Sequence, residues 1–180
     1  MGVVVEKLAG TDRRSIGAAD EVAGEIAADQ ALFDEVFEAL WFDDPVIRMR
    51  AADALEKASR RCPERLVPHK GALLGELAEI EQHEVRWHVA QMLPRLPLNP
   101  QEKKRAAAIV KGFLRDKSAI VRVNALEAFT LLSHGDDDLE AEAFRLLGEA
   151  AERGSSAEKA RARKLLKGFG RAGKRFHKQG

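Results

Sequence analysis

The chain has 180 residues, of which 45% are apolar and 33% charged, with a formal net charge of +1. This composition is too apolar for a disordered chain, and no run approaches the roughly 18 apolar residues that a membrane-spanning helix needs. The single cysteine, Cys62, excludes an internal disulfide framework, and residues 1–6 lack the features of a secretory signal. We therefore expect a cytoplasmic protein of one domain without membrane association.

The first predicted element is a helix within residues 12–28. Apolar residues recur there at helical spacing, namely Ile16, Ala19, Val22, Ala23 and Ile26. We expect residues 1–28 to form an N-terminal segment and capping helix, preceded at most by a short strand at residues 3–5. The whole chain is then all-α, with about nine helices.

A repeat begins after this capping helix. A twelve-residue pattern starts at Asp44, Gln82 and Ser118, and a weaker copy starts at Ser155. The fourth residues of the copies are 38, 36 and 37 positions apart, and they are Ile47, Val85, Val121 and Glu158. In the first three copies apolar residues follow this anchor at +4, +7 and +8, which is one face of a helix. Another amphipathic segment precedes each copy, over residues 30–41, 68–80, 101–115 and 139–151, so the repeating unit is helix, turn, helix.

Local signals mark where these helices begin and end. Asp44 before Pro45 and Asn99 before Pro100 are each a cap followed by a first-turn proline. Ser155 and Glu158 have the spacing of a capping box. Breaks are expected at Cys62-Pro63, in the proline-rich residues 94–100, and at residues 134–136.

The pattern Asp-Pro-x-(Ile/Val)-Arg-x-x-Ala-Ala-x-Ala-Leu resembles the second helix of a HEAT repeat, over roughly residues 29–166. The period is shorter than the usual value of about 40–47, so armadillo-type and bilin-lyase-type variants remain open. The resemblance implies an α-α superhelix, a short HEAT-like solenoid of about four helical-hairpin repeats whose second helices line a concave face. Residues 167–180 are expected to be a basic, flexible tail, because they are too rich in glycine for a long helix.

The residue after each anchor is basic, and it is Arg48, Arg86, Arg122 and Lys159 in turn. A guanidinium at a recurring helical position next to a buried one favours fork-shaped pairing between helices. The resemblance implies a structural ladder in which each arginine pairs with an Asp of an adjacent repeat. We therefore assign these four residues to structure rather than to ligand binding.

The positions left for a partner are +2, +3 and +6 of each second helix. We predict that the partner-binding residues come from these rows: Met49, Arg50, Asp53, Trp87, His88, Gln91, Asn124, Glu127, Arg161 and Lys164. Trp87 is either a partner anchor, since Trp is enriched at interface hot spots, or a packing residue between repeats.

Signals for catalysis are weak, and we predict no catalytic, cofactor-binding or metal-binding residue. His83 and His88 resemble a zinc-protease motif, but they lie about 140° apart around a helix and cannot share a metal as an i, i+4 pair does. His88 is expected to pair with Glu84 on a solvated face. The glycine pattern at residues 168–173 lacks the preceding strand that a dinucleotide-binding turn requires.

Charge is distributed unevenly along the chain. Residues 1–44 carry three Lys/Arg against eleven Asp/Glu, whereas residues 159–180 carry nine Lys/Arg and no acid. We expect a monomer, with weak head-to-tail association between such ends as the alternative.

The predicted function is a non-enzymatic HEAT-repeat binding or scaffold module that holds a protein partner on its concave face. The alternative is nucleic-acid binding through the basic C-terminal repeat and tail. A third reading is a HEAT-like DNA glycosylase, for which Trp41, Trp87 and Asp53 supply the residue types.

Overall fold

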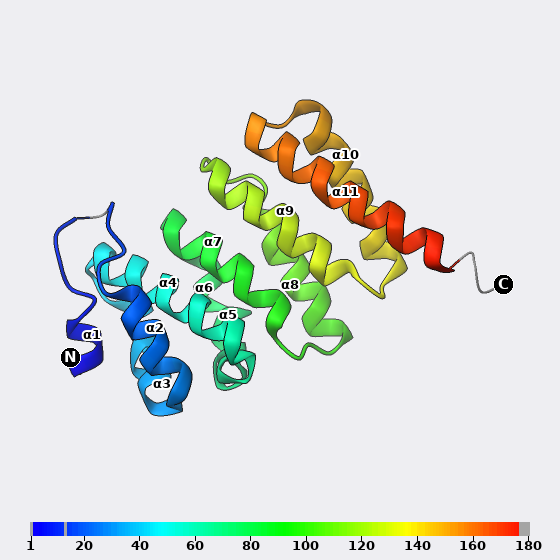
Figure 1. The fold of residues 1–180 in the computed structure, drawn as a ribbon. Coiled ribbons are helices and arrows are strands. Elements are labelled where there is room, and N and C mark those ends of the chain that lie inside the picture. Colours follow the sequence, from blue (N-terminus) through cyan, green and yellow to red (C-terminus); the bar gives the residue numbers. More distant parts are fainter. Residues whose placement is uncertain (1, 13, 177–180) are drawn as a thin grey trace. The chain divides into compact units, whose positions relative to one another are not determined.

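The computed structural model describes residues 2–12 and 14–176, with side chains described as far as Phe169. Every regular element in these residues is helical, so the chain is all-α as predicted (Figure 1). The expected strand at residues 3–5 is wrong, because these residues form the short helix α1 (Val3–Glu6), in which Val4 and Val5 are buried. The described residues hold eleven α-helices rather than about nine, since three of them have only four residues.

The chain divides into two compact units, residues 1–98 (unit 1) and residues 99–180 (unit 2). The division falls in the proline-rich segment that the sequence marked as a break. The repeat domain expected over residues 29–166 was defined by the sequence repeat and not by compactness. The division into two units does not test it, so it stays a prediction.

Unit 1 is built around one long helix, α4 (Pro45–Arg61), which packs against α2, α3 and α7. The flanking elements in chain order are α2 (Ala19–Ala28), α3 (Gln30–Glu38), the 3-10 turn η1 (Ala39–Trp41), η2 (Pro63–His69), α5 (Lys70–Leu73), α6 (Glu76–Glu79), α7 (His83–Met92) and η3 (Leu93–Arg95). The helix predicted over residues 68–80 is broken into three pieces. Pro68 lies in the 3-10 turn, and Gly75 leaves the helical conformation with ψ of −106°.

Unit 2 consists of four longer helices in two hairpins. They are α8 (Pro100–Phe113), α9 (Ala119–Ser133), α10 (Asp137–Arg153) and α11 (Ser156–Phe176). Besides its hairpin partner α8, helix α9 contacts both α10 and α11.

Helix α11 corrects one expectation, because it continues through residues 167–176, where we expected a flexible tail without helix. Leu165, Leu166 and Phe169 pack against the buried cluster of Leu126, Leu147 and Ala162, which gives the added turn an apolar contact. Gly168 faces open space on the same helix and contacts nothing there, so its lack of a side chain removes no packing. Residues 177–180 of the expected tail lie outside the described residues.

The predicted core positions of the first three repeats are all buried. None of the twelve anchor, +4, +7 and +8 side chains is more than 5% exposed; they are Ile47, Ala51, Ala54, Leu55, Val85, Val89, Met92, Leu93, Val121, Ala125, Ala128 and Phe129. Fully burying one of the larger aliphatic or aromatic side chains contributes about 1.5–3 kcal/mol, so this stripe stabilises both units.

The predicted caps are also present. The Asp44 carboxylate accepts hydrogen bonds from the amides of Val46 (2.7 Å) and Ile47 (3.4 Å). Asn99 and Glu102 form a capping box at the start of α8. These contacts satisfy amide groups that a helix leaves without internal partners, and they fix where the second helices begin.

Candidate functional site

The ladder arginines bind the turn before their own helix. Arg48 Nη1 donates to the Phe42 carbonyl at 2.6 Å, and Arg122 Nη1 donates to the Asp116 carbonyl at 2.7 Å. Arg86 Nε donates to the Ile80 carbonyl at 2.8 Å. In each case the acceptor lies six residues earlier, so the arginine fixes the turn between the two helices of its hairpin.

Arg48 and Arg122 also reach the next hairpin. Arg48 Nε donates to Gln82 Oε1 at 2.7 Å, and Arg122 binds both carboxylate oxygens of Glu158, at 2.9 and 3.1 Å. The acceptors are therefore a Gln and a Glu rather than the Asp that the resemblance implied. The side chain of Lys159, the fourth member of the predicted row, makes no hydrogen bond or ion pair with the described residues.

Glu158 stands where the other repeats have an apolar anchor, and its contacts explain the exception. The hydrogen bond from Arg122 is the main reason that the pKa of this carboxyl falls to about 2, and bonds from Ser155 act in the same direction. The Ser155 amide donates to Glu158 at 3.0 Å, which completes the predicted capping box. One carboxylate therefore caps α11 and links it to α9.

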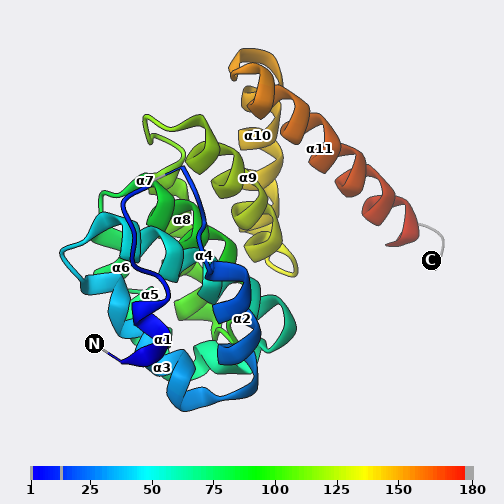
Figure 2. The same ribbon diagram turned by 60° about the vertical axis from the view of Figure 1, so that its left-hand side comes forward.

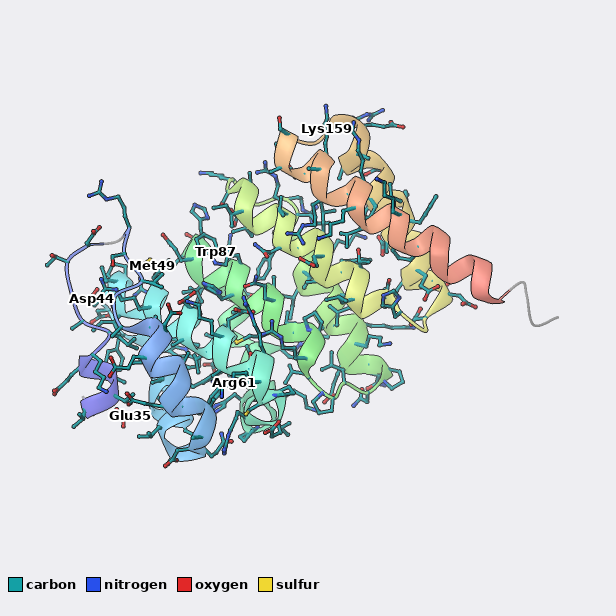
Figure 3. The ribbon with its side chains drawn as sticks, in the orientation of Figure 1. Glu35, Asp44, Met49, Arg61, Trp87 and Lys159 are labelled. Carbon is teal, nitrogen blue, oxygen red and sulfur yellow. The ribbon has the colours of Figure 1, made fainter. Side chains whose placement is uncertain are left out.

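Half of the predicted partner-binding residues meet at one pocket in unit 1, with a volume of about 280 Å³. Helix α4 contributes Met49, Arg50 and Asp53, and helix α7 contributes Trp87 and His88. Figure 3 shows Met49 and Trp87 side by side on this part of unit 1. The remaining lining residues, which sequence reasoning did not select, are Arg14, Ser15, Ile16 and Glu84.

The third wall of this pocket belongs to the segment between α1 and α2, described over residues 8–12 and 14–18, which we call the N-terminal strap. Figure 2 shows it as the dark blue loop that leaves α1 and returns to α2. Nothing in the local sequence of the strap predicts its position. The signal that could have found it is Arg50, a large charged residue in a helix whose neighbours are apolar.

Arg50 holds the strap in place. It is only 5% exposed, and its guanidinium donates to four backbone carbonyls of the strap, those of Leu8 (3.0 Å), Ala9 (2.7 Å), Asp12 (3.2 Å) and Ser15 (3.0 Å). A buried guanidinium needs such acceptors, because an unpaired charge in the interior is costly. Arg50 was predicted to contact a partner, but in the structure its donors are turned to the chain's own backbone.

Two glycines make this close approach possible. Gly10 and Gly17 have φ of +150° and +54°, backbone conformations that residues other than glycine rarely adopt. A Cβ added at either position would lie 2.6 or 2.8 Å from the Arg50 guanidinium. The strap and Arg50 are therefore held in fixed positions relative to each other.

His88 is buried, so the expected solvated pair with Glu84 is wrong. It is 8% exposed, and burial lowers the pKa of its imidazole even though Asp53 and Glu56 act in the opposite direction. Its Nδ1 lies 3.1 Å from Gln91 Oε1, and its Nε2 lies 3.8 Å from Asp53 Oδ1. His88 is thus a neutral wall of the pocket.

Asp53 takes part in a charged chain of contacts that joins α4 to α2. Its Oδ2 accepts from Lys57 Nζ at 2.6 Å, and Lys57 also binds Asp20 of α2 at 2.5 Å. The carboxylate of Asp53 is therefore neutralised by Lys57 within unit 1.

Glu84 and Trp87 differ from these residues because both are half-buried at the pocket and still reach solvent. Glu84 makes no hydrogen bond or ion pair with the described residues. The Trp87 ring lies 5.5 Å from the His88 ring at a tilt of 58°. Together with Met49 and Ile16, these side chains give the pocket an apolar floor, an aromatic face and one carboxylate.

The pocket holds the residue types of a serine hydrolase, but they are not assembled into a catalytic triad. Ser15 Oγ accepts a hydrogen bond from the Gly17 amide at 3.1 Å, and the His88–Asp53 separation of 3.8 Å exceeds a hydrogen bond. Within residues 2–12 and 14–176, no three His, Cys, Asp or Glu side chains are grouped to hold a metal ion. No helix in the same residues is long and apolar enough to cross a membrane.

The corresponding positions in unit 2 lie closer to the surface. Arg161 Nη1 binds Glu127 Oε2 at 2.5 Å, and the Asn124 amide donates to the Ile120 carbonyl at 2.9 Å. Lys164 is exposed. The contact from row +3 of one copy to row +6 of the previous copy thus recurs, as His88–Asp53 in unit 1 and Arg161–Glu127 in unit 2.

A second pocket in unit 1, of about 440 Å³, lies among the first helices of the hairpins. The His69 ring stacks on Phe37 at 3.8 Å and its Nε2 lies 2.6 Å from Asp34 Oδ1. Trp41 lines this second pocket, so the three residue types of the glycosylase reading do not share one site.

Comparison with known proteins identifies the fold alone. No protein-family model matches the sequence, and no curated protein matches it either. The fold is similar to the crystal structure of an engineered protein, with a TM-score of 0.60 and 18% sequence identity, over 91% of this chain and 76% of the other.

Proposed function

We propose that this protein is a non-enzymatic, HEAT-like binding module that holds a segment of a protein partner at the pocket of unit 1. The observation that carries the proposal is the convergence on one pocket of rows +2, +3 and +6 of α4 with rows +2 and +3 of α7. In a solenoid these rows are what the repeat leaves over after its core and its ladder are satisfied.

The physical state of the pocket supports this use. Arg50 and the two strap glycines fix its outer wall, so little ordering is needed on binding, and preorganised sites gain affinity by avoiding that cost. Its volume of about 280 Å³ lies just below the usual range for small-molecule sites, about 300–1,000 Å³. A single large side chain fills such a volume, and a half-buried Trp beside it is a typical hot-spot wall.

The test compares two matched substitutions in row +2, one in each unit. Tagged wild-type protein, Trp87→Ala and Val123→Ala are used to capture proteins from native lysate, with identification by mass spectrometry. A partner that is retained by wild type and Val123→Ala, and lost by at least tenfold with Trp87→Ala, supports the proposal. Capture that is equal for all three proteins contradicts it.

Unit 2 favours a second candidate function, which is binding of nucleic acid. It carries eighteen Lys/Arg against eleven Asp/Glu, and Arg163, Lys164 and Lys167 are exposed along α11. Mobility shifts on duplex and single-stranded DNA and RNA at about 50 and 300 mM salt test this candidate, because phosphate contacts weaken steeply with salt. A shift at low salt that Lys164→Gln combined with Lys167→Gln abolishes would support it, and no shift at either salt would contradict it.

A further inference from the structure

We infer that the pocket of unit 1 takes a basic side chain, Arg or Lys, presented by an extended segment of another protein. This inference rests on the proposed function and specifies the chemistry of the partner. It follows from which groups in the pocket are satisfied internally and which are left to interact.

The two residues that remain available lie on one face of α7. Glu84 and Trp87 are three positions apart, so their side chains are neighbours on the helix surface. A cation over the face of a Trp ring is attracted by the negative π-face, and a carboxylate beside it adds direct ion pairing. Met49 and Ile16 line the same pocket and supply apolar contact for the methylene stem that Lys and Arg carry below the charged group.

The other charged groups of the pocket do not remove this preference. Arg50 is saturated by the strap carbonyls, so its charge is already compensated. The Arg14 side chain is 94% exposed and lies 3.5 Å from Asp12, directed to solvent. Asp53 is paired with Lys57. Glu84 is the carboxylate of the pocket that has no partner among the described residues, and an incoming cation would satisfy it.

The net charge of unit 1 favours the same occupant. Residues 1–98 carry twelve Lys/Arg and eighteen Asp/Glu, a balance of −6. A negative domain raises the local concentration of basic segments and accelerates their encounter, and this effect fades as salt screens it.

The basic run of residues 159–175 in a second copy of this chain is the less suitable source. It lies on α11, which packs on a buried cluster of unit 2 through Leu165 and Phe169. Side chains on a helix about 10 Å across are harder to insert into a pocket bounded by the strap than those of an extended segment. We therefore commit to a segment of another protein, and a second copy becomes an outcome of the test.

The test selects random dodecapeptides displayed on phage against the full-length protein and then measures binding of synthetic copies. We expect the enriched peptides to share one Arg or Lys, and replacing it with Leu to weaken binding more than tenfold. Glu84→Gln should weaken binding about five- to tenfold and Trp87→Ala more than tenfold. Glu81→Gln, which removes an exposed carboxylate just before α7, is the matched control and should change binding less than twofold. Thermal melting of each variant verifies that it is folded.

Each result has a defined meaning. Peptides that need Trp87 but share an apolar or acidic residue would overturn the inference while leaving the proposed function intact. Enriched peptides that ignore Trp87, or a failure to enrich any peptide, would count against both. A peptide of residues 159–178 that binds as tightly as the selected peptides and needs Glu84 would show that a second copy is the occupant, contrary to the inference.

Discussion

The two units use the same repeat frame and differ in what covers it. In both, anchor-face residues form the core, a ladder arginine binds the turn six residues earlier, and a side chain of row +3 lies opposite row +6 of the preceding copy. In unit 1 the strap binds Arg50 of row +3, Arg50 and His88 are both buried, and a pocket forms beside them. In unit 2 the row +3 residues Asn124 and Arg161 are only half-buried, and both reach solvent.

The chemistry of the ladder differs as well. In unit 1 Arg48 donates a hydrogen bond to the neutral Gln82, whereas in unit 2 Arg122 donates to the ionised Glu158. Net charge follows the same division, −6 in residues 1–98 and +7 in residues 99–180. The comparison teaches that the repeat specifies the scaffold, while the covering segment and the charge of each unit specify what it can bind.

The largest expected effect concerns a buried carboxylate of unit 1. Glu56 is 1% exposed, and it binds Arg95 Nη2 at 2.5 Å and Arg60 Nη2 at 2.6 Å. Burial alone would raise its pKa, but the hydrogen bonds from Arg60 and Arg95 lower it. Glu56→Ala removes a buried carboxylate that pairs with the partly buried Arg95 and the exposed Arg60. Because Arg95 keeps the Glu56 carbonyl and Ser59 Oγ as acceptors, the loss should be about 3 kcal/mol in denaturant unfolding, the low end for breaking a buried pair.

The matched control for this prediction is the exposed pair of unit 2, Arg145–Glu149 on α10. Glu149→Ala should cost no more than about 0.5 kcal/mol, as is usual for exposed i, i+4 pairs. Equal losses for the two variants would mean that burial does not distinguish these carboxylates.

A second prediction separates row +3 in the two units. Arg50→Met removes the donors for four strap carbonyls and should lower the unfolding free energy by about 2–3 kcal/mol, with faster amide exchange in residues 8–18. Arg161→Met breaks one exposed contact and should cost under about 1 kcal/mol. Unchanged exchange in the strap after Arg50→Met would contradict the role given to Arg50.

The ladder difference predicts a pH dependence that belongs to unit 2. The pKa of Glu158 is lowered to about 2 in the folded chain from an ordinary value of 4.5, so its contribution is present above pH 5 and is lost as pH falls toward 2. Glu158→Gln should cost about 1.5–3 kcal/mol at pH 7, the range for hydrogen bonds to a charged group, and almost nothing at pH 2. Gln82→Ala in unit 1 should cost an amount that does not vary over the same pH range. A Glu158→Gln penalty that is constant with pH would refute this assignment.

The smallest expected effect is a gain in stability from helical glycines. Gly24 in α2 and Gly148 in α10 have open space where a Cβ would be placed. Gly24→Ala and Gly148→Ala should each stabilise their unit by about 0.5–1 kcal/mol, because alanine loses less backbone entropy on folding. Gly17→Ala is the contrast, since its positive φ and its contact with Arg50 should make the same change destabilising. Thermal melting of the three variants checks the sign in each case.

Local patterns predicted the second helices well, because their cores repeat with helical spacing and their starts carry caps such as Asp44 and Ser155. Local patterns failed to predict the extent of a helix or the burial of a side chain where contacts with residues distant in the sequence determine them. Phe169 extends α11 by packing against residues of α9 and α10, which outweighs the low helix propensity of Gly168. The burial of Arg50 depends on strap carbonyls 35 to 42 residues earlier in the chain, and no periodicity within α4 encodes those contacts.

The candidate site was predictable by row but not by role. Met49, Asp53 and Trp87 meet as the row assignment implied, because each row places residues of successive copies on one surface. Arg50 was predicted to bind a partner, but it holds the strap. Glu84 was predicted to pair with His88, but its carboxylate is open at the pocket.

The central claim is that binding belongs to the strap-covered pocket of unit 1 and not to the equivalent rows of unit 2. Hydrogen exchange of the full chain, with and without the tightest selected peptide, tests it most directly because it reports on both units in one experiment. The account predicts added protection in residues 10–16, 46–53 and 84–91, with no change in residues 119–127 and 156–164. Protection confined to the two unit 2 segments would contradict it.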